Sequence, residues 1–177
     1  GPEGFTRCDC FDQVPALCGR SVSLADPDGS GDTCILVCNY RLDPNLFWEK
    51  VDGVPRNTAL QRGLAGTETD GYWGHTIGNA WCDYDGDGDV DVFLANLAHP
   101  RFISFSDRSM LLRNDSGVFR DVREESGIRY EETHAFPAWG DFDGDGRYDL
   151  YITSVYPGRR SFLYLNRPGG FVDATWL

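Results

Sequence analysis

The sequence predicts an all-β fold that is β-propeller-like, with about three four-stranded blades. Three observations predict it: an aspartate-rich segment recurs, a strand–turn–strand block recurs downstream of each copy, and no segment carries the long 3.6-residue period of an amphipathic helix. The first aspartates of the three copies, Asp26, Asp83 and Asp141, are 57 and 58 residues apart. Each repeat is therefore a small unit of about four strands that cannot bury both faces of its sheet alone. Such units pack against their neighbours in β-propellers and related stacks.

Each aspartate-rich copy places one short strand before an acidic loop and one after it. The two best copies are AWCDYDGDGDVDVFLAN from Ala80 and AWGDFDGDGRYDLYITS from Ala138, and a weaker copy is LADPDGSGDTCILVCN from Leu24. The apolar residues that follow each loop have the length and the β-branched and aromatic character of a buried strand. These segments supply two strands of each unit.

The downstream block supplies the other two strands as a hairpin. It reads PNLFWEKVDGVPRNTALQRGL from Pro44, RSMLLRNDSGVFRDVREESGI from Arg108 and RSFLYLNRPGGFVDATW from Arg160. A Gly-containing turn separates two short runs in every copy, which is typical of a β-hairpin. The best helical candidate is a single turn in DVREESGI, residues 121–128.

These elements divide the chain into a Cys-rich N-terminal segment, 1–20, and three repeats over 21–177, at approximately 21–64, 65–128 and 129–177. Propellers typically have four to eight blades, so three do not close a ring. Either further blades lie outside this chain, or other copies associate with it to complete the propeller. Met110 is the only methionine, so we expect a processed piece of a longer chain.

The acidic loops have the donor pattern of a calcium site. In the second copy, carboxylates stand at loop positions 1, 3, 5 and 9, and a fifth aspartate at position 7 would offer its backbone carbonyl; the third copy repeats this with arginine at position 7. Glycine at position 6, Gly88 or Gly146, allows the sharp turn. Crowded carboxylates repel one another unless a cation neutralises them. The predicted ligands are Asp83, Asp85, Asp87, Asp89 and Asp91 for one Ca2+, and Asp141, Asp143, Asp145, Arg147 and Asp149 for another, with Asp89 and Arg147 using the backbone carbonyl.

Two alternatives bear on these loops. An EF-hand would need a bidentate Glu at position 12 and flanking helices, but Leu94 and Ile152 occupy that position inside strand-like runs. The structural alternative is that Asp-Gly pairs only make tight turns. The first copy is weaker because Cys34 replaces the last carboxylate, so a third calcium site there, from Asp26, Asp28, Ser30 and Asp32, is a possibility that the sequence leaves open.

The six cysteines lie in the first half of the chain, and their even number suits three disulfides and an oxidising compartment. Fifteen connectivities are possible. The rival reading is a zinc or redox site, but the spacings are not the paired C-x2-C pattern. We expect disulfides, and hence a secreted, extracellular or periplasmic location, from Cys8, Cys10, Cys18, Cys34, Cys38 and Cys82.

The net charge of −12, from 21 aspartates and seven glutamates against 16 basic residues, disfavours nucleic acid and anionic membranes as partners. No apolar run is long enough to span a membrane. Catalytic motifs such as G-x-S-x-G or H-E-x-x-H are absent from the sequence, so we expect no enzyme. The sequon Asn114-Asp115-Ser116 would accept a glycan only in a eukaryotic source.

Four aromatic residues recur at matched places. His75 and His134 precede their loops by eight and seven residues; they would either line a channel and bind a metal or an anion, or form local hydrogen bonds, and we favour the bonds. Trp81 and Trp139 lie next to their loops. Aromatic residues at fixed repeat positions are more often blade-to-blade core than a platform for sugars, so we expect them in the core.

The motifs DYDGDGDVD and DFDGDGRYD, each followed by a strand and by LLRNDSGVFRDV or LYLNRPGGFVDAT, resemble the FG-GAP or VCBS-type repeats of integrin-like β-propellers. The hairpin block is similar to that of cartilage-acidic-protein-like secreted repeat proteins. The similarity runs from about Ser21 to Trp176. It implies one calcium ion per blade and a role in adhesion, ligand recognition or scaffolding, and this sequence departs from the pattern at Cys34, in its Cys-rich start and in its few blades.

Three functions therefore remain to be compared. The first is an extracellular calcium-binding repeat domain, with structural Ca2+, that binds a protein or glycan ligand or completes a propeller with other segments or copies. The second is part of a propeller-scaffold carbohydrate-active enzyme, a polysaccharide lyase or hydrolase, since function resides in sites carried on folds. The third is a self-assembling structural subunit with open strand edges.

Overall fold

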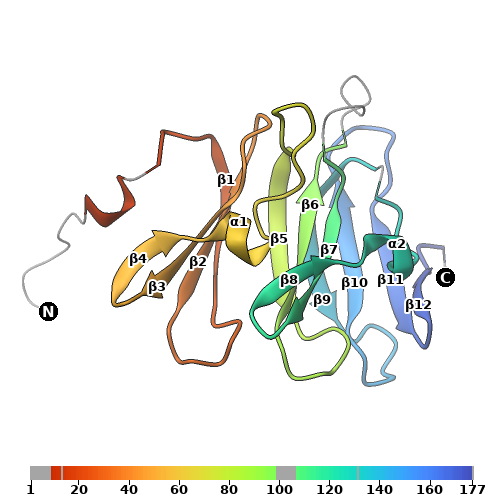
Figure 1. Ribbon diagram of the computed structural model, residues 1–177. Coiled ribbons are helices and arrows are strands. Elements are labelled where there is room, and N and C mark those ends of the chain that lie inside the picture. The colour runs from red at the N-terminus through yellow and green to blue at the C-terminus, as the bar shows by residue number, and fades with distance from the viewer. Residues whose placement is uncertain (1–8, 13, 99–106, 131, 177) are drawn as a thin grey trace, which may run out of the picture.

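The computed structural model describes residues 9–12, 14–98, 107–130 and 132–176. Three four-stranded antiparallel sheets follow one another along the chain and stand side by side in Figure 1. Every sheet is a meander in which sequential strands are neighbours. The sheets form three propeller-like blades that do not close into a ring, which confirms the predicted fold class.

The strands of each blade take the order in which the sequence predicts them. Blade 1 consists of β1 (Gly19–Ala25), β2 (Cys34–Asn39), β3 (Leu46–Val51) and β4 (Val54–Asn57). Blade 2 consists of β5 (Thr76–Cys82), β6 (Asp91–Asn96), β7 (Met110–Asp115) and β8 (Val118–Asp121). Blade 3 consists of β9 (His134–Gly140), β10 (Asp149–Ser154), β11 (Phe162–Arg167) and β12 (Gly170–Asp173). The first strands, β1, β5 and β9, contact one another in turn.

In the described part of the chain the helices are single turns: the 3-10 turn η1 (Asp9–Phe11), α1 (Ala59–Arg62) and α2 (Arg123–Ser126). The sequence predicts α2 but not α1, although both are four residues long. Both end at a glycine with positive φ, where a Cβ would lie 2.3 Å (Gly63) or 2.6 Å (Gly127) from a carbonyl of the next blade's fourth strand. Glycine therefore permits this close approach between blades. Among the described residues, no helix has the length and apolar character needed to cross a membrane.

The hydrophobic core lies between blades rather than inside one. One cluster joins blades 1 and 2, and a second joins blades 2 and 3. Strand β6 is buried along its whole length, because Val92 and Leu94 belong to the first cluster while Phe93 and Ala95 belong to the second. This two-sided burial explains the continuous apolar run after the second acidic loop.

The two repeated tryptophans, Trp81 and Trp139, pack at these interfaces between blades, as predicted. Trp81 contacts the first cluster, and its Nε1 donates a hydrogen bond to Ser23 Oγ of blade 1 (2.8 Å). Trp139 contacts the second cluster, and its Nε1 donates to the carbonyl of Ala80 in blade 2 (3.1 Å). His134 is fully buried and its Nδ1 lies 2.8 Å from Ser109 Oγ, which matches the expected local hydrogen bonding.

The cysteines differ from the expectation of three disulfides. Cys18, Cys34, Cys38 and Cys82 are free thiols, whereas Cys8 and the side chain of Cys10 lie outside the described part of the chain. Cys34 and Cys38 are four residues apart on β2 and both enter the first core cluster. Four strand residues span about 13 Å, beyond the reach of a disulfide between those two.

Candidate metal-binding loops

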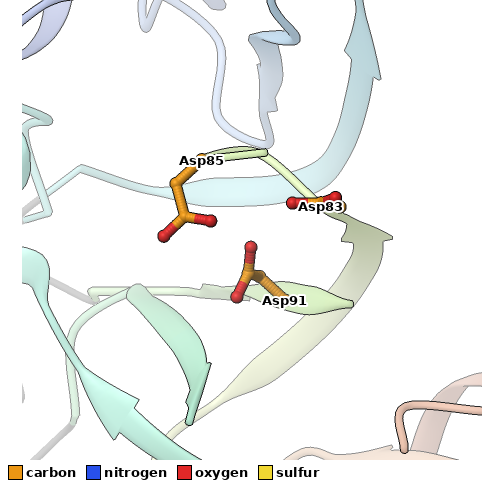
Figure 2. Close-up of side chains that lie close together, drawn as sticks. All are labelled: Asp83, Asp85 and Asp91. Carbon is orange, nitrogen blue, oxygen red and sulfur yellow. The ribbon is translucent and has the colours of Figure 1, made fainter. Parts of the chain in front are cut away.

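The acidic loops lie at equivalent places, between the first and second strands of each blade. We call them loop 1 (26–34), loop 2 (83–91) and loop 3 (141–149). In loop 2, Asp83 follows β5 directly and Asp91 is the first residue of β6. Carboxylate oxygens of Asp83, Asp85 and Asp91 all lie within 4.8 Å of one another, and Figure 2 shows the three side chains converging on one space. Three carboxylates are thus brought to one point.

Asp83 organises the backbone of loop 2. Its two carboxylate oxygens accept hydrogen bonds from the N–H groups of Gly86 (2.8 Å) and Gly88 (3.1 Å). Both glycines have positive φ, 76° and 99°, which a Cβ would disfavour. Asp85 and Asp87 each accept a further bond from the N–H two residues on. The loop therefore keeps its wrapped shape through its own side chains.

Asp91 provides the buried end of the site. Its side chain is inaccessible to solvent and accepts hydrogen bonds from the N–H groups of Tyr84 (3.1 Å) and Asn114 (2.8 Å). Burial raises the pKa of Asp91 to about 7, and the neighbouring carboxylates of Asp85 and Asp87 add to the effect, while the two N–H bonds oppose it. A cation beside these carboxylates would offset both the burial and the repulsion.

Loop 3 repeats this geometry. Asp141, Asp143 and Asp149 form the second group of converging carboxylates. Asp141 accepts from the N–H groups of Gly144 (2.7 Å) and Gly146 (3.0 Å), and the buried Asp149 accepts from those of Phe142 and Asn166, both at 2.8 Å. Because separate parts of the sequence fold to one arrangement, the convergence is a property of the motif.

Loop 3 differs from loop 2 in its counter-charges. Arg167 forms ion pairs with Asp143 and, at 2.6 Å, with Asp145, and Arg147 also pairs with Asp145. The pKa of Asp143 is lowered chiefly by its hydrogen bond to Arg167. Loop 2 has Asp89 where loop 3 has Arg147, and β7 has Asp115 where β11 has Arg167. Two guanidinium groups thus already neutralise part of loop 3.

Four predicted ligands lie outside the two converging groups. Asp87 accepts from the N–H of Asp89, and Asp145 faces the arginines. The Asp89 carboxylate accepts from the N–H of Ser116 (3.2 Å), and Arg147 Nε donates to the carbonyl of Asn166 (2.9 Å). The predicted carbonyl ligation by the two position-7 residues, and side-chain ligation by Asp87 and Asp145, stay predictions.

Loop 1 folds in a similar way but does not gather three metal-ligating side chains. Asp26 accepts from the N–H groups of Ser30 (3.0 Å) and Gly31 (2.8 Å), and the Ser30 N–H also lies 3.1 Å from Asp28 Oδ1. Cys34 is buried in the core where the other loops have aspartate. Lys50, on β3, forms an ion pair with Asp32. The ammonium group thus supplies a positive charge beside loop 1.

Sequence reasoning missed Asn114 and Asn166, the asparagines that bind the buried aspartates through their backbone N–H groups. The available signal was their shared place in the hairpin blocks LLRND and LYLNR, where blade 1 has Lys50. Asn114 is also the sequon residue, and its side chain is fully buried, with Nδ2 donating to the carbonyls of Pro27 (2.7 Å) and Val90 (3.2 Å). In this fold Asn114 is inaccessible to glycosylation.

The geometry agrees with a comparison against protein families. Residues 83–152 match the FG-GAP-like repeat, a span that begins at the first aspartate of loop 2 and ends in β10. The two loops with converging carboxylates therefore lie within an FG-GAP-like repeat region, which confirms the resemblance predicted from the loop motifs.

Curated relatives extend this similarity over most of the chain. It is similar to cartilage acidic protein 1 of Xenopus tropicalis, with 30% identity over 156 residues that cover 84% of this chain and 24% of the relative. The mouse and human cartilage acidic proteins 1 are each 27% identical over the same share of this chain. The chain spans about a quarter of the length of these relatives.

Proposed function

We propose that the chain is an extracellular or periplasmic calcium-binding repeat domain that acts in binding, adhesion or assembly and not as an enzyme. The observation that carries the proposal is the repeated convergence of three carboxylates, in loop 2 and again in loop 3. All the donors are hard oxygens, the type that calcium prefers, and calcium tolerates more varied geometry than magnesium. Asp83, Asp85 and Asp91 would hold one ion, and Asp141, Asp143 and Asp149 the other.

Calcium would have a structural role in this proposal. Each loop joins two strands of a blade, so an ion at its carboxylates would fix both strands and relieve the repulsion between the aspartates. Isothermal titration calorimetry should find two calcium ions per chain. Asp83→Ala and Asp141→Ala should each remove one, because each removes the side chain that wraps its loop, whereas Asp89→Ala should retain two. If wild-type protein does not bind calcium, the proposal is wrong.

The ligand surface that we favour is the groove of about 370 Å3 between loops 2 and 3. Tyr84, Tyr148 and Arg167 line it together with Asp83 and Asp85 of loop 2. Aromatic rings and a guanidinium group suit a protein or glycan ligand. A glycan array with and without calcium, followed by a reducing-sugar assay on any hit, tests this role: binding without turnover supports it, and turnover would favour a lyase or hydrolase instead.

The outer face of blade 3 is the proposed site for a further blade of the same repeat. Tyr151 and Leu163 pair across β10 and β11 as Phe93 and Leu111 pair across β6 and β7. The earlier pair is buried against blade 3, whereas Tyr151 is 39% exposed. Val172, which pairs with Leu165 across β11 and β12, is 55% exposed. Sedimentation distinguishes the sources of that blade: a mass above 19.8 kDa indicates other copies, and a monomer indicates a segment of a longer chain.

A further inference from the structure

Asn166 contacts two acidic loops at once. Its backbone N–H donates to Asp149 Oδ1 of loop 3 (2.8 Å), and its side-chain Nδ2 donates to the carbonyl of Tyr84 in loop 2 (2.8 Å). Tyr84 stands between Asp83 and Asp85, and its own N–H donates to Asp91. A single residue of β11 therefore connects a buried carboxylate of loop 3 to the backbone between two carboxylates of loop 2.

The same connection exists one blade earlier. Asn114 donates through its backbone N–H to Asp91 of loop 2 and through Nδ2 to the carbonyl of Pro27 in loop 1 (2.7 Å). Pro27 stands between the first two aspartates of loop 1, as Tyr84 does in loop 2. Because the geometry repeats, the link is built into the blade. The loop that Asn166 reaches backwards has converging carboxylates, and the loop that Asn114 reaches backwards does not.

Two further contacts hold Tyr84 against blade 3. Its ring stacks on Trp139 with centroids 6.0 Å apart and an interplanar angle of 12°, and it lies 5.8 Å from the ring of Phe171. Asn166 is 9% exposed, so water competes little for its bonds. A change in the position of β11 relative to loop 3 would thus be transmitted to Tyr84 and to the carboxylates beside it.

We propose that Asn166 is a positioning residue shared by loops 2 and 3, through which calcium at either loop raises the affinity of the other. This inference rests on the proposed calcium function. An ion bound at Asp149 would order Asn166, whose side-chain amide then holds the carbonyl of Tyr84 in loop 2. Part of the ordering that loop 2 needs for calcium binding is then already complete before calcium binds at loop 2. Linkage requires the effect to be equal in both directions. Since one buried hydrogen bond carries most of it, the expected coupling is about three- to tenfold in affinity.

The experiment is a thermodynamic cycle on the full chain, read by calorimetric titration with calcium alone. Loop 2 affinity is measured with loop 3 intact and with loop 3 disabled by Asp141→Ala, and the ratio is the coupling factor. Repeating the pair in Asn166→Ala protein should bring the ratio to one. In Asn114→Ala protein the ratio should persist, because none of the bonds of Asn114 goes to loop 3. Loop 2 itself should bind more weakly, since the variant keeps the backbone N–H to Asp91 but loses the Nδ2 bonds to the carbonyls of Val90 and Pro27.

The outcomes separate this inference from the function on which it rests. No calcium binding by wild-type protein would refute the proposed function. If wild-type protein binds two ions but the coupling factor is one, the proposed function stands and the proposed coupling is refuted. This outcome is already visible from wild-type and Asp141→Ala protein, without an asparagine variant. A ratio unchanged by Asn166→Ala would assign the coupling to another contact and overturn the role of Asn166. If Asn166→Ala fails to fold, Asn166→Ser, which keeps the backbone N–H and a small polar side chain, replaces it in the cycle.

Discussion

Calcium removal should destabilise the fold by an amount set by the number of ions that unfolding releases. An ion that binds only the folded state stabilises it by RT ln(1 + [Ca]/Kd), so each tenfold rise in saturating calcium adds about 1.4 kcal/mol per site. Loops 2 and 3 gather three carboxylates each, and loop 1 does not. Two sites therefore predict about 2.8 kcal/mol per tenfold change in free calcium. For a chain of this size, that is a shift in Tm of about 6 to 11 °C.

The assay is equilibrium urea unfolding, followed by tryptophan fluorescence, at free calcium concentrations fixed by chelator buffers. The slope of the unfolding free energy against log calcium should fall to about 1.4 kcal/mol in Asp83→Ala protein, because one ion is lost. Magnesium in place of calcium serves as the control. A wild-type slope near 4.2 kcal/mol would mean that loop 1 also binds an ion and that Lys50 does not substitute for it. A free energy of unfolding that is the same in excess chelator and in saturating calcium would refute the structural role of calcium.

Further predictions concern charge, packing and thiols. Arg167→Ala should strengthen calcium binding at loop 3 by roughly two- to fivefold in calorimetric titration, because it removes a competing cation, whereas Arg120→Ala on the exposed hairpin should not change it. Ile152→Ala should lower the free energy of unfolding by about 2 to 5 kcal/mol in urea titrations, since the side chain is fully buried between blades, while the exposed Val172→Ala should cost under about 0.5 kcal/mol. Burial raises the pKa of Cys34 and Cys38 to about 11, so native protein at pH 8 should alkylate slowly at these two thiols. In denatured, unreduced protein, mass spectrometry should find alkylation at each of the free thiols Cys18, Cys34, Cys38 and Cys82, and a bridged peptide that contains any of them would contradict this prediction.

The repeat and its loops could be predicted because their signal is local. Aspartates at alternate positions with glycine at position 6 specify a wrapped loop, and the converging Asp83, Asp85 and Asp91 lie within nine residues of sequence. A period of 57 to 58 residues with two strands and a hairpin then specifies a four-stranded blade. The acidic loops and the four-stranded blade can therefore both be predicted from short segments and their repetition along the chain.

The remaining parts depend on contacts between segments far apart in the chain. Asn166 reaches Tyr84, 82 residues away, and Asn114 reaches Pro27, 87 residues away. No local pattern fixes the register that brings them together. The cysteine expectation failed for a related reason: counting residues says nothing of direction, and Cys34 and Cys38 point into the core from one strand. The ion pair between Lys50 on β3 and Asp32 in loop 1 also requires the folded blade.

The asparagine and tryptophan links run from each blade back to the one synthesised before it. Asn114 and Trp81 of blade 2 reach blade 1, and Asn166 and Trp139 of blade 3 reach blade 2. During synthesis from the N-terminus, a blade can pair its own strands early, but its loop gains these bonds only when the following blade emerges. Completion of these bonds is thus delayed by one blade, and removal of blade 3 would take from blade 2 the bonds that Asn166 and Trp139 make to it.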